Sequence, residues 1–500
     1  MLRYTYPQVN LPYTTVTREE TSKLAPRAVT TRPHYSAAWA KRNRNNLAGA
    51  LTMTHSLEHQ TATPLTLTEE EDRPLVVGRP VSIETQEFQN DVKEICETGI
   101  FTNNGPFSMR LEEQIRTYLD VKHAINVSNA TKGLELLLRA LDLPAEGEVL
   151  LPSYTFIATA HAVIEAGLRP VFCDVDLNTH LLTPEHLESK ISHRTAAILA
   201  VNLWGLSCSK ELTDFAQQKN IPVIFDSAHA FGAADSTGKL IGGSGTAHVF
   251  SMHATKLFNS FEGGCITTND SQLALRLQSM RNFGITGQDL VELWGTNAKM
   301  SEIHAAFALR QLKHIEETKE IFLRNVHIYK LELSAHKLPG ITLWNENFMN
   351  TGCTHAYVCV RIGKPAPITR DFLIESLRTH GIYAKRYFFP GIHKLDFYKN
   401  LCKHDEILHN TETLNREIMV LPTGRFIEEE DVKRVITTIA SLYNAYATTN
   451  TCADTEVNVS VDTSSVSQRQ KYVYNRIQEL QGQISCYEDE LPALSQRYHQ

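Results

Sequence analysis

Between Val149 and Asp226 the chain alternates short apolar runs with stretches of helical character, and this alternation restricts the fold more than any other feature. Expected strands are 149–151, 171–175, 196–201 and 222–226, and expected helices are 159–165, 185–190 and 209–219. Such alternation is typical of a mostly parallel sheet covered on both faces. We therefore expect an α/β protein that binds its ligand at the carboxyl ends of the strands.

The segment 246–268 places a lysine between two of the expected strands. An apolar run ends near Phe250, a polar turn leads to Lys256, and a second strand follows Glu262 and two glycines. A lysine whose pKa is lowered by burial can form a Schiff base with a carbonyl. Ser251, five residues upstream, is suited to hold an anionic group of the same ligand. The alternative is a surface lysine on a hairpin, which is the commoner situation for a lone lysine.

Asp226 ends an expected buried strand and begins the sequence DSAHAFGA. A carboxylate at a strand end can hold a protonated ring nitrogen, and His229 is close enough in sequence to orient that ring. An aspartate that caps the following turn is the alternative.

A polar turn at 128–131 lies between an expected strand, 124–127, and a helix with leucines at positions 134, 137, 138 and 141. The free N–H groups and the dipole of a helix N-terminus attract anions after such a turn. For the turn alone we favour the simpler interpretation, an N-cap made by Asn129 or Thr131.

One ligand can account for all of these features together with an aromatic residue just past another strand end: Lys256, Asp226, Ser251, the 128–131 turn and Phe156. It carries an aldehyde, a flat ring with a basic nitrogen and a phosphate. These are the features of pyridoxal 5′-phosphate, which proteins bind through a lysine, an acidic partner for the ring nitrogen and a phosphate cup.

With 500 residues, the chain is expected to form two or more domains. Residues 1–74 are basic and poor in acids, and we interpret them as a disordered extension, with a targeting segment or a basic arm as alternatives. We expect a large ligand-binding domain over 75–329 and a smaller α+β domain over 330–447. Residues 448–500 are expected to be a linker and a terminal helix.

The composition excludes several classes of function. The net charge of −7 provides no overall attraction to nucleic acid or anionic membranes. No apolar run is long enough to span a bilayer, and the N-terminus has no apolar signal core. The nine cysteines show no CxxC spacing, so we expect neither a disulfide framework nor a metal site, and we predict a cytoplasmic protein.

From about Pro74 to Tyr446 the sequence resembles the DegT/DnrJ/EryC1/StrS family of sugar aminotransferases. The segments that carry this resemblance are NNGPF, VSNATKGLELLLRAL, LPSYTFIATAHAV, FDSAHAFGA, FSMHATKLFNSFEGGCITT, NAKMSEIHAAFAL, YFFPGIH and VLPTGRF. The resemblance implies the aspartate-aminotransferase fold (fold type I), pyridoxal phosphate as cofactor, and a homodimer with shared active sites.

The resemblance also assigns roles to individual residues. It implies that Lys256 forms the Schiff base and moves the proton, and that Asp226 pairs with the ring nitrogen. Phe156 takes the position of the aromatic that stacks on the ring, and His229 that of a residue near the ring hydroxyl. The phosphate is assigned to Ala130, Thr131, Ser251 and, from the neighbouring subunit, Asn297; Tyr387 and His393 lie in a segment that lines the sugar-nucleotide site. Many members have glycine where this chain has Ala130, but the backbone amide is kept.

The sequence HATK, which ends at Lys256, resembles the corresponding sequence of family members that aminate C4 of a dTDP-4-keto-6-deoxy sugar. It implies transfer of an amino group from L-glutamate to dTDP-4-dehydro-6-deoxyglucose. The alternatives are amination at another position or on another nucleotide carrier, a dehydratase of the same fold, and a non-catalytic protein that binds the cofactor. Dehydratase relatives carry histidine in place of the lysine, so Lys256 argues against that alternative.

Overall fold

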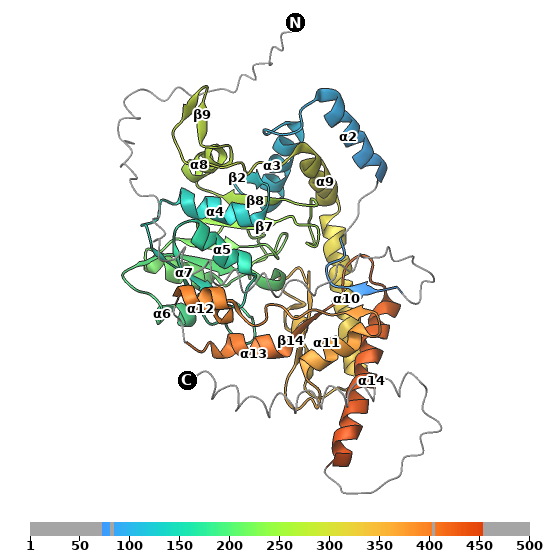
Figure 1. Ribbon diagram of the computed structural model, residues 1–500. Helices are drawn as coiled ribbons and strands as arrows, with labels where there is room; N and C mark the ends of the chain where they lie inside the picture. The colour runs from blue at the N-terminus through green and yellow to red at the C-terminus, as the bar shows by residue number, and fades with distance from the viewer. Residues whose placement is uncertain (1–72, 81–84, 403–405, 454–500) are drawn as a thin grey trace, which may run out of the picture. The chain divides into compact units, whose positions relative to one another are not determined.

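The computed structural model describes residues 73–80, 85–402 and 406–453 (Figure 1). The predictions of a disordered leader before residue 73 and of a helix beyond residue 470 fall outside these residues.

A seven-stranded sheet organises the larger part of the molecule, with the strand order β2-β8-β7-β6-β5-β3-β4. All neighbouring pairs are parallel except those made by β8, which is antiparallel to both β2 and β7. The expected alternation of strands and helices, and the mostly parallel sheet, are therefore confirmed. The strands are β2 (His123–Val127), β3 (Glu148–Pro152), β4 (Arg169–Cys173), β5 (Thr195–Val201), β6 (Val223–Asp226), β7 (Ala247–Ser251) and β8 (Gly264–Thr268).

Helices cover both faces of this sheet because successive strand residues point to opposite sides. One face packs against α4 (Ala130–Ala140), α5 (Ile157–Glu165) and α8 (Ser271–Arg281). The opposite face packs against two groups of helices. These are α2 (Thr85–Thr98), α3 (Pro106–Leu119) and α9 (Glu302–Lys313) toward one edge, and α6 (Pro184–Glu188) and α7 (Lys210–Gln218) toward the other.

A second, smaller sheet with the order β11-β12-β14 is antiparallel throughout. Its strands are β11 (Ile341–Leu343), β12 (Val358–Ile362) and β14 (Ile418–Leu421), and it shares a core with α10 (Ile315–His336), α11 (Arg370–Arg378) and α14 (Glu429–Ala453). Further elements are α12 (Asp396–Cys402), α13 (His409–Glu417), the pair β9 (Ile285–Gly287) and β10 (Leu290–Val291), and the short helices η4 (Leu203–Gly205), η5 (Trp344–Phe348) and η6 (Ile392–Lys394).

We call the seven-stranded sheet with its helices the larger unit, and the sheet β11-β12-β14 with α10, α11 and α14 the smaller unit. The first described strand belongs to the smaller unit. Strand β1 (Leu75–Val76) pairs in parallel with β13 (Ile382–Tyr383), and Leu75 is 1% exposed in the core of the smaller unit. Arg73 forms an ion pair with Asp431 and donates to the carbonyl of Phe426. The order of residues along the chain could not show this, because the two strands lie some three hundred residues apart.

Two further boundaries differ from the sequence-based expectation. Helices α9 and α10 follow one another along the chain and are separated at His314. The predicted boundary between domains at 329 falls inside α10, which packs Ile315 into the larger unit and Val326 into the smaller one. Helix α14 continues to Ala453, past the predicted start of the linker at 448.

Candidate active site

The sheet brings the predicted ligand-binding residues to one edge. Strands β2, β8, β7 and β6 are neighbours, and in their register Gly264 pairs with both Val127 and Ser251. The turn after β2, the end of β7 and the start of β8 therefore meet. Asp226 ends β6, the next strand, where it pairs with Val249. Residues that are distant in sequence thus meet at the carboxyl ends of the parallel strands, as expected for a ligand site in this kind of sheet.

Lys256 lies in the loop between β7 and β8 and is half-buried. Its Nζ donates a hydrogen bond to the hydroxyl of Tyr357 at 3.2 Å. Burial lowers the pKa of Lys256 to about 8, and the nearby charge of Asp226 partly opposes this change. The amine is therefore free of its proton far more often than that of a surface lysine, which favours a nucleophile over the hairpin alternative.

Asp226 is a buried carboxylate, 5% exposed, that is bonded without an ion pair in the described residues. Thr159 Oγ1 donates to Oδ2 at 2.7 Å, and the backbone N–H of Ala228 donates to Oδ1 at 3.1 Å. Burial raises the pKa of Asp226, while these two hydrogen bonds and the charge of Lys256 lower it. A buried carboxylate that has no ion-pair partner is stabilised when a cationic hydrogen-bond donor binds beside it.

His229 follows Asp226 by one turn and presents a nitrogen that has no partner. Its Nδ1 is buried and makes no hydrogen bond to any residue that the structure describes. Its ring lies 4.3 Å from that of Tyr357, centroid to centroid. Burial, and to a lesser degree the charge of Lys256, holds the pKa of His229 well below its ordinary value, so the imidazole is neutral. A buried polar atom of this kind normally has a partner, and here a ligand can supply one.

The N-terminus of α4 packs tightly against the start of β8. Asn129 caps the helix by accepting from the N–H of Lys132 at 2.8 Å, so the N-cap interpretation is confirmed. A Cβ on Gly264 would lie 2.8 Å from the backbone nitrogen of Ala130, which no side chain allows. Within the part of the chain that the structure describes, the hydroxyl of Ser251, at the end of β7, accepts a single long hydrogen bond, 3.3 Å, from the N–H of His253. The helix amides and this hydroxyl form a small polar cradle suited to an anion.

Two more of the predicted site residues, Phe156 and Asn297, lie at the surface. Phe156 is 58% exposed at the start of α5, the helix that carries Thr159. Asn297 is exposed, and the carbonyl of the adjacent Ala298 accepts from the N–H of Ser128 at 2.8 Å, so this stretch adjoins the 128–131 turn of its own chain. The assignment of Asn297 to the phosphate site of a neighbouring subunit stays a prediction.

Of the two predicted substrate residues, the structure brings only Tyr387 close to Lys256. The ring of Tyr387 lies 5.9 Å from that of Tyr357, the hydrogen-bond partner of the lysine. His393 is 3% exposed, its Nδ1 lies 2.6 Å from Ser153 Oγ, and its Nε2 faces Glu412 at 3.6 Å. Its surroundings are those of a buried structural residue, and a substrate contact for His393 stays a prediction.

Sequence reasoning missed two residues that touch the site. Thr159 lies one turn into α5, where a hydroxyl on a buried helix face has no sequence pattern of its own. Tyr357 lies 101 positions from Lys256, in the smaller unit, so no local pattern could connect the two.

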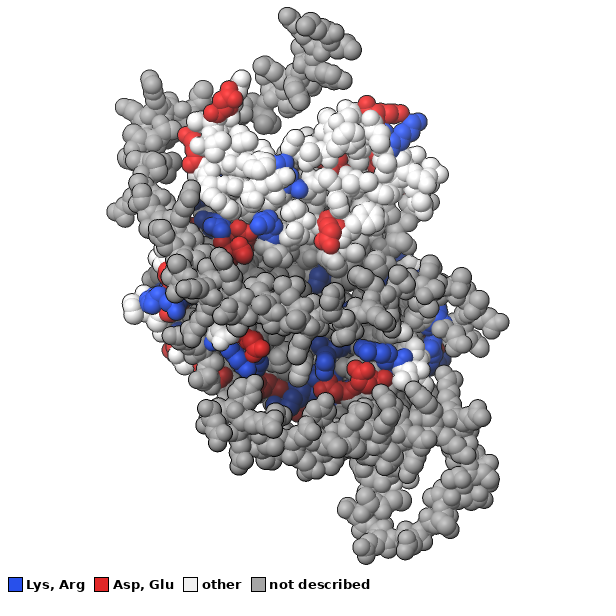
Figure 2. All heavy atoms as spheres, in the orientation of Figure 1, with Lys and Arg blue, Asp and Glu red and all other residues white. Residues whose placement is uncertain are grey.

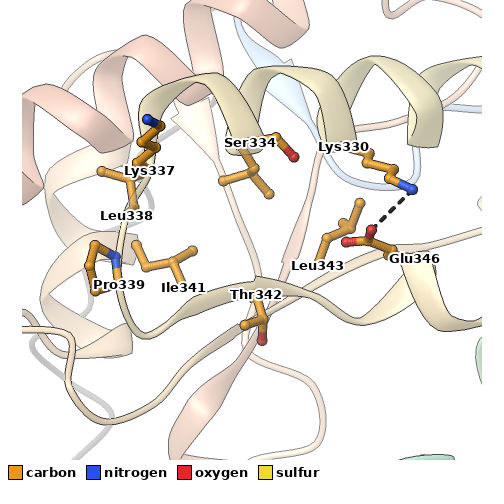
Figure 3. Close-up of a pocket in the computed structure, with 10 residues that line it drawn as sticks. Lys330, Ser334, Lys337, Leu338, Pro339, Ile341, Thr342, Leu343 and Glu346 are labelled. Carbon is orange, nitrogen blue, oxygen red and sulfur yellow. Dashed lines mark ion pairs between the residues drawn. The ribbon is translucent and has the colours of Figure 1, made fainter.

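A larger hollow lies away from this site, between α10 and β11 (Figure 3). It measures about 370 Å³, belongs wholly to the smaller unit, and is bordered by the ion pair of Lys330 with Glu346 at 3.0 Å. A smaller hollow is lined by His229, Ser251, Lys256 and Tyr357. We take the smaller hollow as the candidate site because the unpaired and pKa-shifted groups gather there, and size alone does not identify chemistry.

Comparison with known proteins agrees with this geometry. The DegT/DnrJ/EryC1/StrS aminotransferase family matches residues 82–440. The chain belongs to this family. It is 31% identical to dTDP-4-amino-4,6-dideoxy-D-glucose transaminase of Shigella dysenteriae over 74% of this chain and 100% of the relative. It is 33% identical to GDP-perosamine synthase of Caulobacter vibrioides over 69% of this chain and 92% of the relative.

Among solved structures, DesI, determined in the presence of its TDP-sugar product, superposes with a TM-score of 0.71 at 35% identity. The alignment covers 76% of this chain and 96% of DesI. The expected fold type I and the expected class of pyridoxal-phosphate-dependent aminotransferase are thereby confirmed. None of the described helices of this family member is both long and apolar enough to cross a membrane.

The residues at the site fit the family's cofactor. A buried carboxylate without an ion pair in the described residues, Asp226, suits a protonated ring nitrogen, and the unpaired Nδ1 of His229 suits a ring oxygen. The cradle against Gly264 suits a phosphate, and the exposed Phe156 offers a ring face. Lys256 supplies an amine with a lowered pKa.

Proposed function

We propose that this protein moves an amino group from L-glutamate to C4 of dTDP-4-dehydro-6-deoxyglucose, with pyridoxal phosphate as cofactor. The observation that carries the proposal is the meeting of Lys256 and Asp226 at the strand ends, with the pKa of the lysine lowered to about 8. An amine in that state can both form a covalent bond to a carbonyl and carry a proton near neutral pH.

When bound, pyridoxal phosphate supplies an aldehyde that joins amines covalently and a ring that withdraws electrons. Lys256 takes a proton from one carbon and returns it to another. Because its pKa is lowered to about 8, the amine can both accept and release a proton near neutral pH. Asp226 holds the proton on the ring nitrogen, and Thr159 and Ala228 keep the carboxylate in place. The amides of Ala130 and Thr131, with the Ser251 hydroxyl, hold the phosphate, and Phe156 covers a face of the ring.

The choice of sugar rests on the relatives. The Shigella dysenteriae transaminase is matched over its whole length, and DesI was solved with a TDP-linked product. The comparable identity to GDP-perosamine synthase favours a second candidate, a GDP-linked keto sugar. Steady-state rates with dTDP- and GDP-linked 4-keto-6-deoxy sugars at equal concentration will separate the two candidates.

The visible spectrum of the purified protein, before and after addition of L-glutamate, tests the reaction class. The wild type is expected to show the absorbance of lysine-bound cofactor and to lose it with glutamate, whereas Lys256→Ala shows no such change. Wild-type protein that shows no such band when supplied with cofactor would refute the lysine assignment. A band that glutamate leaves unchanged would keep the cofactor and require a different donor or reaction.

We also propose that the protein acts as a homodimer in the cytoplasm. Ile100, Phe101 and Ile303 expose 42%, 58% and 41% of their surface near the start of α9, where the N–H of Glu302 donates to the carbonyl of Phe101. Phe261, 44% exposed, joins them through His304 and lies in the loop that carries Lys256. In the view of Figure 2, few charged side chains lie in the upper part of the molecule, where Figure 1 places α3 and α9. An apolar patch of this kind beside an active site suits a second copy of the chain.

Light scattering coupled to gel filtration tests the dimer. Phe101→Asp combined with Ile303→Asp is expected to convert a dimer into a monomer. Leu331→Asp, at a site 68% exposed on α10, is the control and should leave the dimer intact. A wild type that elutes as a monomer would refute the assembly. For the cytoplasmic proposal, the six cysteines that the structure describes with their side chains are all free thiols, which suits a reducing compartment.

A further inference from the structure

Tyr357 reaches the amine of Lys256 from the smaller unit. It lies just before β12, is 5% exposed, and its hydroxyl accepts the hydrogen bond from Lys256 Nζ at 3.2 Å. Lys256 lies in the loop between β7 and β8 of the larger sheet, so this bond joins the reactive group of one unit to the other unit.

The backbone around Tyr357 is held by one buried amide side chain. Asn345, in η5, is 0% exposed, and its Nδ2 donates to the carbonyl of Tyr357 at 2.7 Å. Its Oδ1 accepts from the N–H of Cys359, also at 2.7 Å. Both ends of this amide are therefore used to fix the start of β12, which leaves the ring of Tyr357 little freedom to move away.

The larger unit holds the ring of Tyr357 from the other side. Trp204 is fully buried, and its ring lies 5.3 Å from that of Tyr357. The backbone of Trp204 has a φ of 59°, an unfavourable left-handed conformation for a bulky residue that the packing around it must maintain. The next residue, Gly205, accepts from the N–H of Thr354 at 3.1 Å, and a Cβ there would lie 2.0 Å from Thr354 Oγ1. This contact ties the strained turn to the segment that leads into Tyr357.

We propose that Tyr357 is a positioning residue for Lys256. The hydroxyl of Tyr357 holds the amine of Lys256 in place and favours the protonated form of that amine. The proposal rests on the proposed function, in which Lys256 carries the proton. It adds that the smaller unit, through Asn345 and Tyr357, controls how readily Lys256 gives up that proton.

The groups that face the amine determine the sign of the expected effect. Asp226 from β6 favours the charged amine, and burial disfavours it. His229 is neutral and lies against the ring of Tyr357. A hydroxyl bonds an ammonium group more strongly than a neutral amine, so removing the hydroxyl should lower the pKa of Lys256 further.

The test compares Tyr357→Phe with Tyr443→Phe in the cofactor-free protein. Tyr443 also lies in the smaller unit, but its hydroxyl donates to the carbonyl of Pro339 at 2.9 Å and does not touch Lys256. Trace acetylation over a range of pH, with Lys256 followed by peptide mass spectrometry, reports the titration midpoint of this amine without any turnover. We expect the midpoint in Tyr357→Phe to fall by about one pH unit, so that labelling well below the midpoint rises roughly tenfold. Tyr443→Phe should match the wild type.

An unchanged midpoint in Tyr357→Phe, or an equal fall in both variants, would overturn the proposal. If Tyr357→Phe does not fold, Tyr357→His, which keeps a hydrogen-bonding ring, replaces it. Asn345→Ala removes the bond that holds the backbone of Tyr357. The midpoint of Tyr357→His must then lie closer to that of the wild type than to that of Asn345→Ala. In holoenzyme, the acidic limb of the kcat profile, where Lys256 becomes protonated and can no longer accept a proton, should move in the same direction as the acetylation midpoint. The glutamate-induced spectral change of the wild type tests the proposed function separately, so failure of one does not imitate failure of the other.

Discussion

At the scale of single residues, burial controls the chemistry of this site. Lys256 and Asp226 are both shielded from water, and burial favours the uncharged form of each. It therefore lowers the pKa of the lysine and raises the pKa of the aspartate. Each group therefore destabilises the cofactor-free protein to some degree and is relieved by a ligand of the right charge. Such a cost is common where a protein is organised for function rather than for stability.

The pKa of Lys256 predicts how the stability of the cofactor-free protein depends on pH. Below about pH 8 the lysine is charged in both folded and unfolded chains, so folding carries the full cost of burying the charge. Lys256→Met should therefore raise the free energy of unfolding at pH 7, by at most about 3 kcal/mol. The gain should fade between about pH 8 and the ordinary lysine value of 10.5. Urea denaturation across this range measures the effect, and Lys93→Met, at a side chain 76% exposed, should show no comparable trend.

Thr159 predicts a separate effect on cofactor affinity. Thr159→Val removes the donor to Asp226 Oδ2 while keeping the shape of the side chain. A hydrogen bond to a charged group contributes roughly 1.5–3 kcal/mol, so affinity for pyridoxal phosphate should fall about tenfold or more. Titration of the visible band measures the dissociation constant. Thr267→Val, which removes a bond to the carbonyl of Gly242 in the same sheet, is the control, and an equal loss in both variants would contradict a specific role of Thr159.

At the scale of elements, the close contact of α4 with β8 forms the anion cradle. The helix starts immediately after β2 because Asn129 caps it, and the glycine at the start of β8 lets the two backbones approach. The strand, the turn and the helix are each recognisable in sequence. Their contact with β8 follows only from the antiparallel pairing of β2 with a strand more than a hundred residues later.

Gly264→Ala tests this contact. The added Cβ would meet the backbone of Asn129 and Ala130 at 2.8 Å, and backbone cannot give way as the end of a side chain can. Affinity for pyridoxal phosphate should fall more than affinity for pyridoxal, which lacks the phosphate, and the free energy of unfolding should fall by about 1–3 kcal/mol. Gly287→Ala is the control, since its Cβ would meet only Leu290 at 3.7 Å. Equal losses for the two ligands would show that the cradle does not hold the phosphate.

At the scale of the whole molecule, polar contacts join the two units around the site. Asp174, just after β4 of the larger sheet, accepts from the N–H groups of Asn410 and Thr411 and from the Thr411 hydroxyl, at 2.7–2.9 Å. These bonds cap α13, which leads directly into β14 of the smaller sheet. The position of the smaller unit, and with it that of Tyr357, depends on such contacts.

Asp174→Asn should weaken this junction. The amide that replaces one carboxylate oxygen cannot accept from α13 at that position, so we expect the free energy of unfolding to fall by about 1–3 kcal/mol. Chemical denaturation measures the change. Asp270→Asn, at the N-cap of α8 within one unit, is the matched control, because asparagine caps helices as well as aspartate does. A loss at Asp174 no larger than that at Asp270 would show that the junction does not depend on this carboxylate.

The local part of the fold is determined by the sequence, because strands, turns and helices have periodicities and caps that neighbouring residues reveal. The alternation over 149–226, the leucines of α4 and the lysine between β7 and β8 are all recognisable in this way. Parallel strands also place their ends together, so Asp226, Ser251 and Lys256 can be grouped from the sequence alone. Three features depend on tertiary structure: the pairing of β1 with β13, the bond from Thr159 to Asp226 and the approach of Tyr357 to Lys256. Each joins residues that are far apart along the chain, and their meeting depends on how whole elements pack, which no local pattern records.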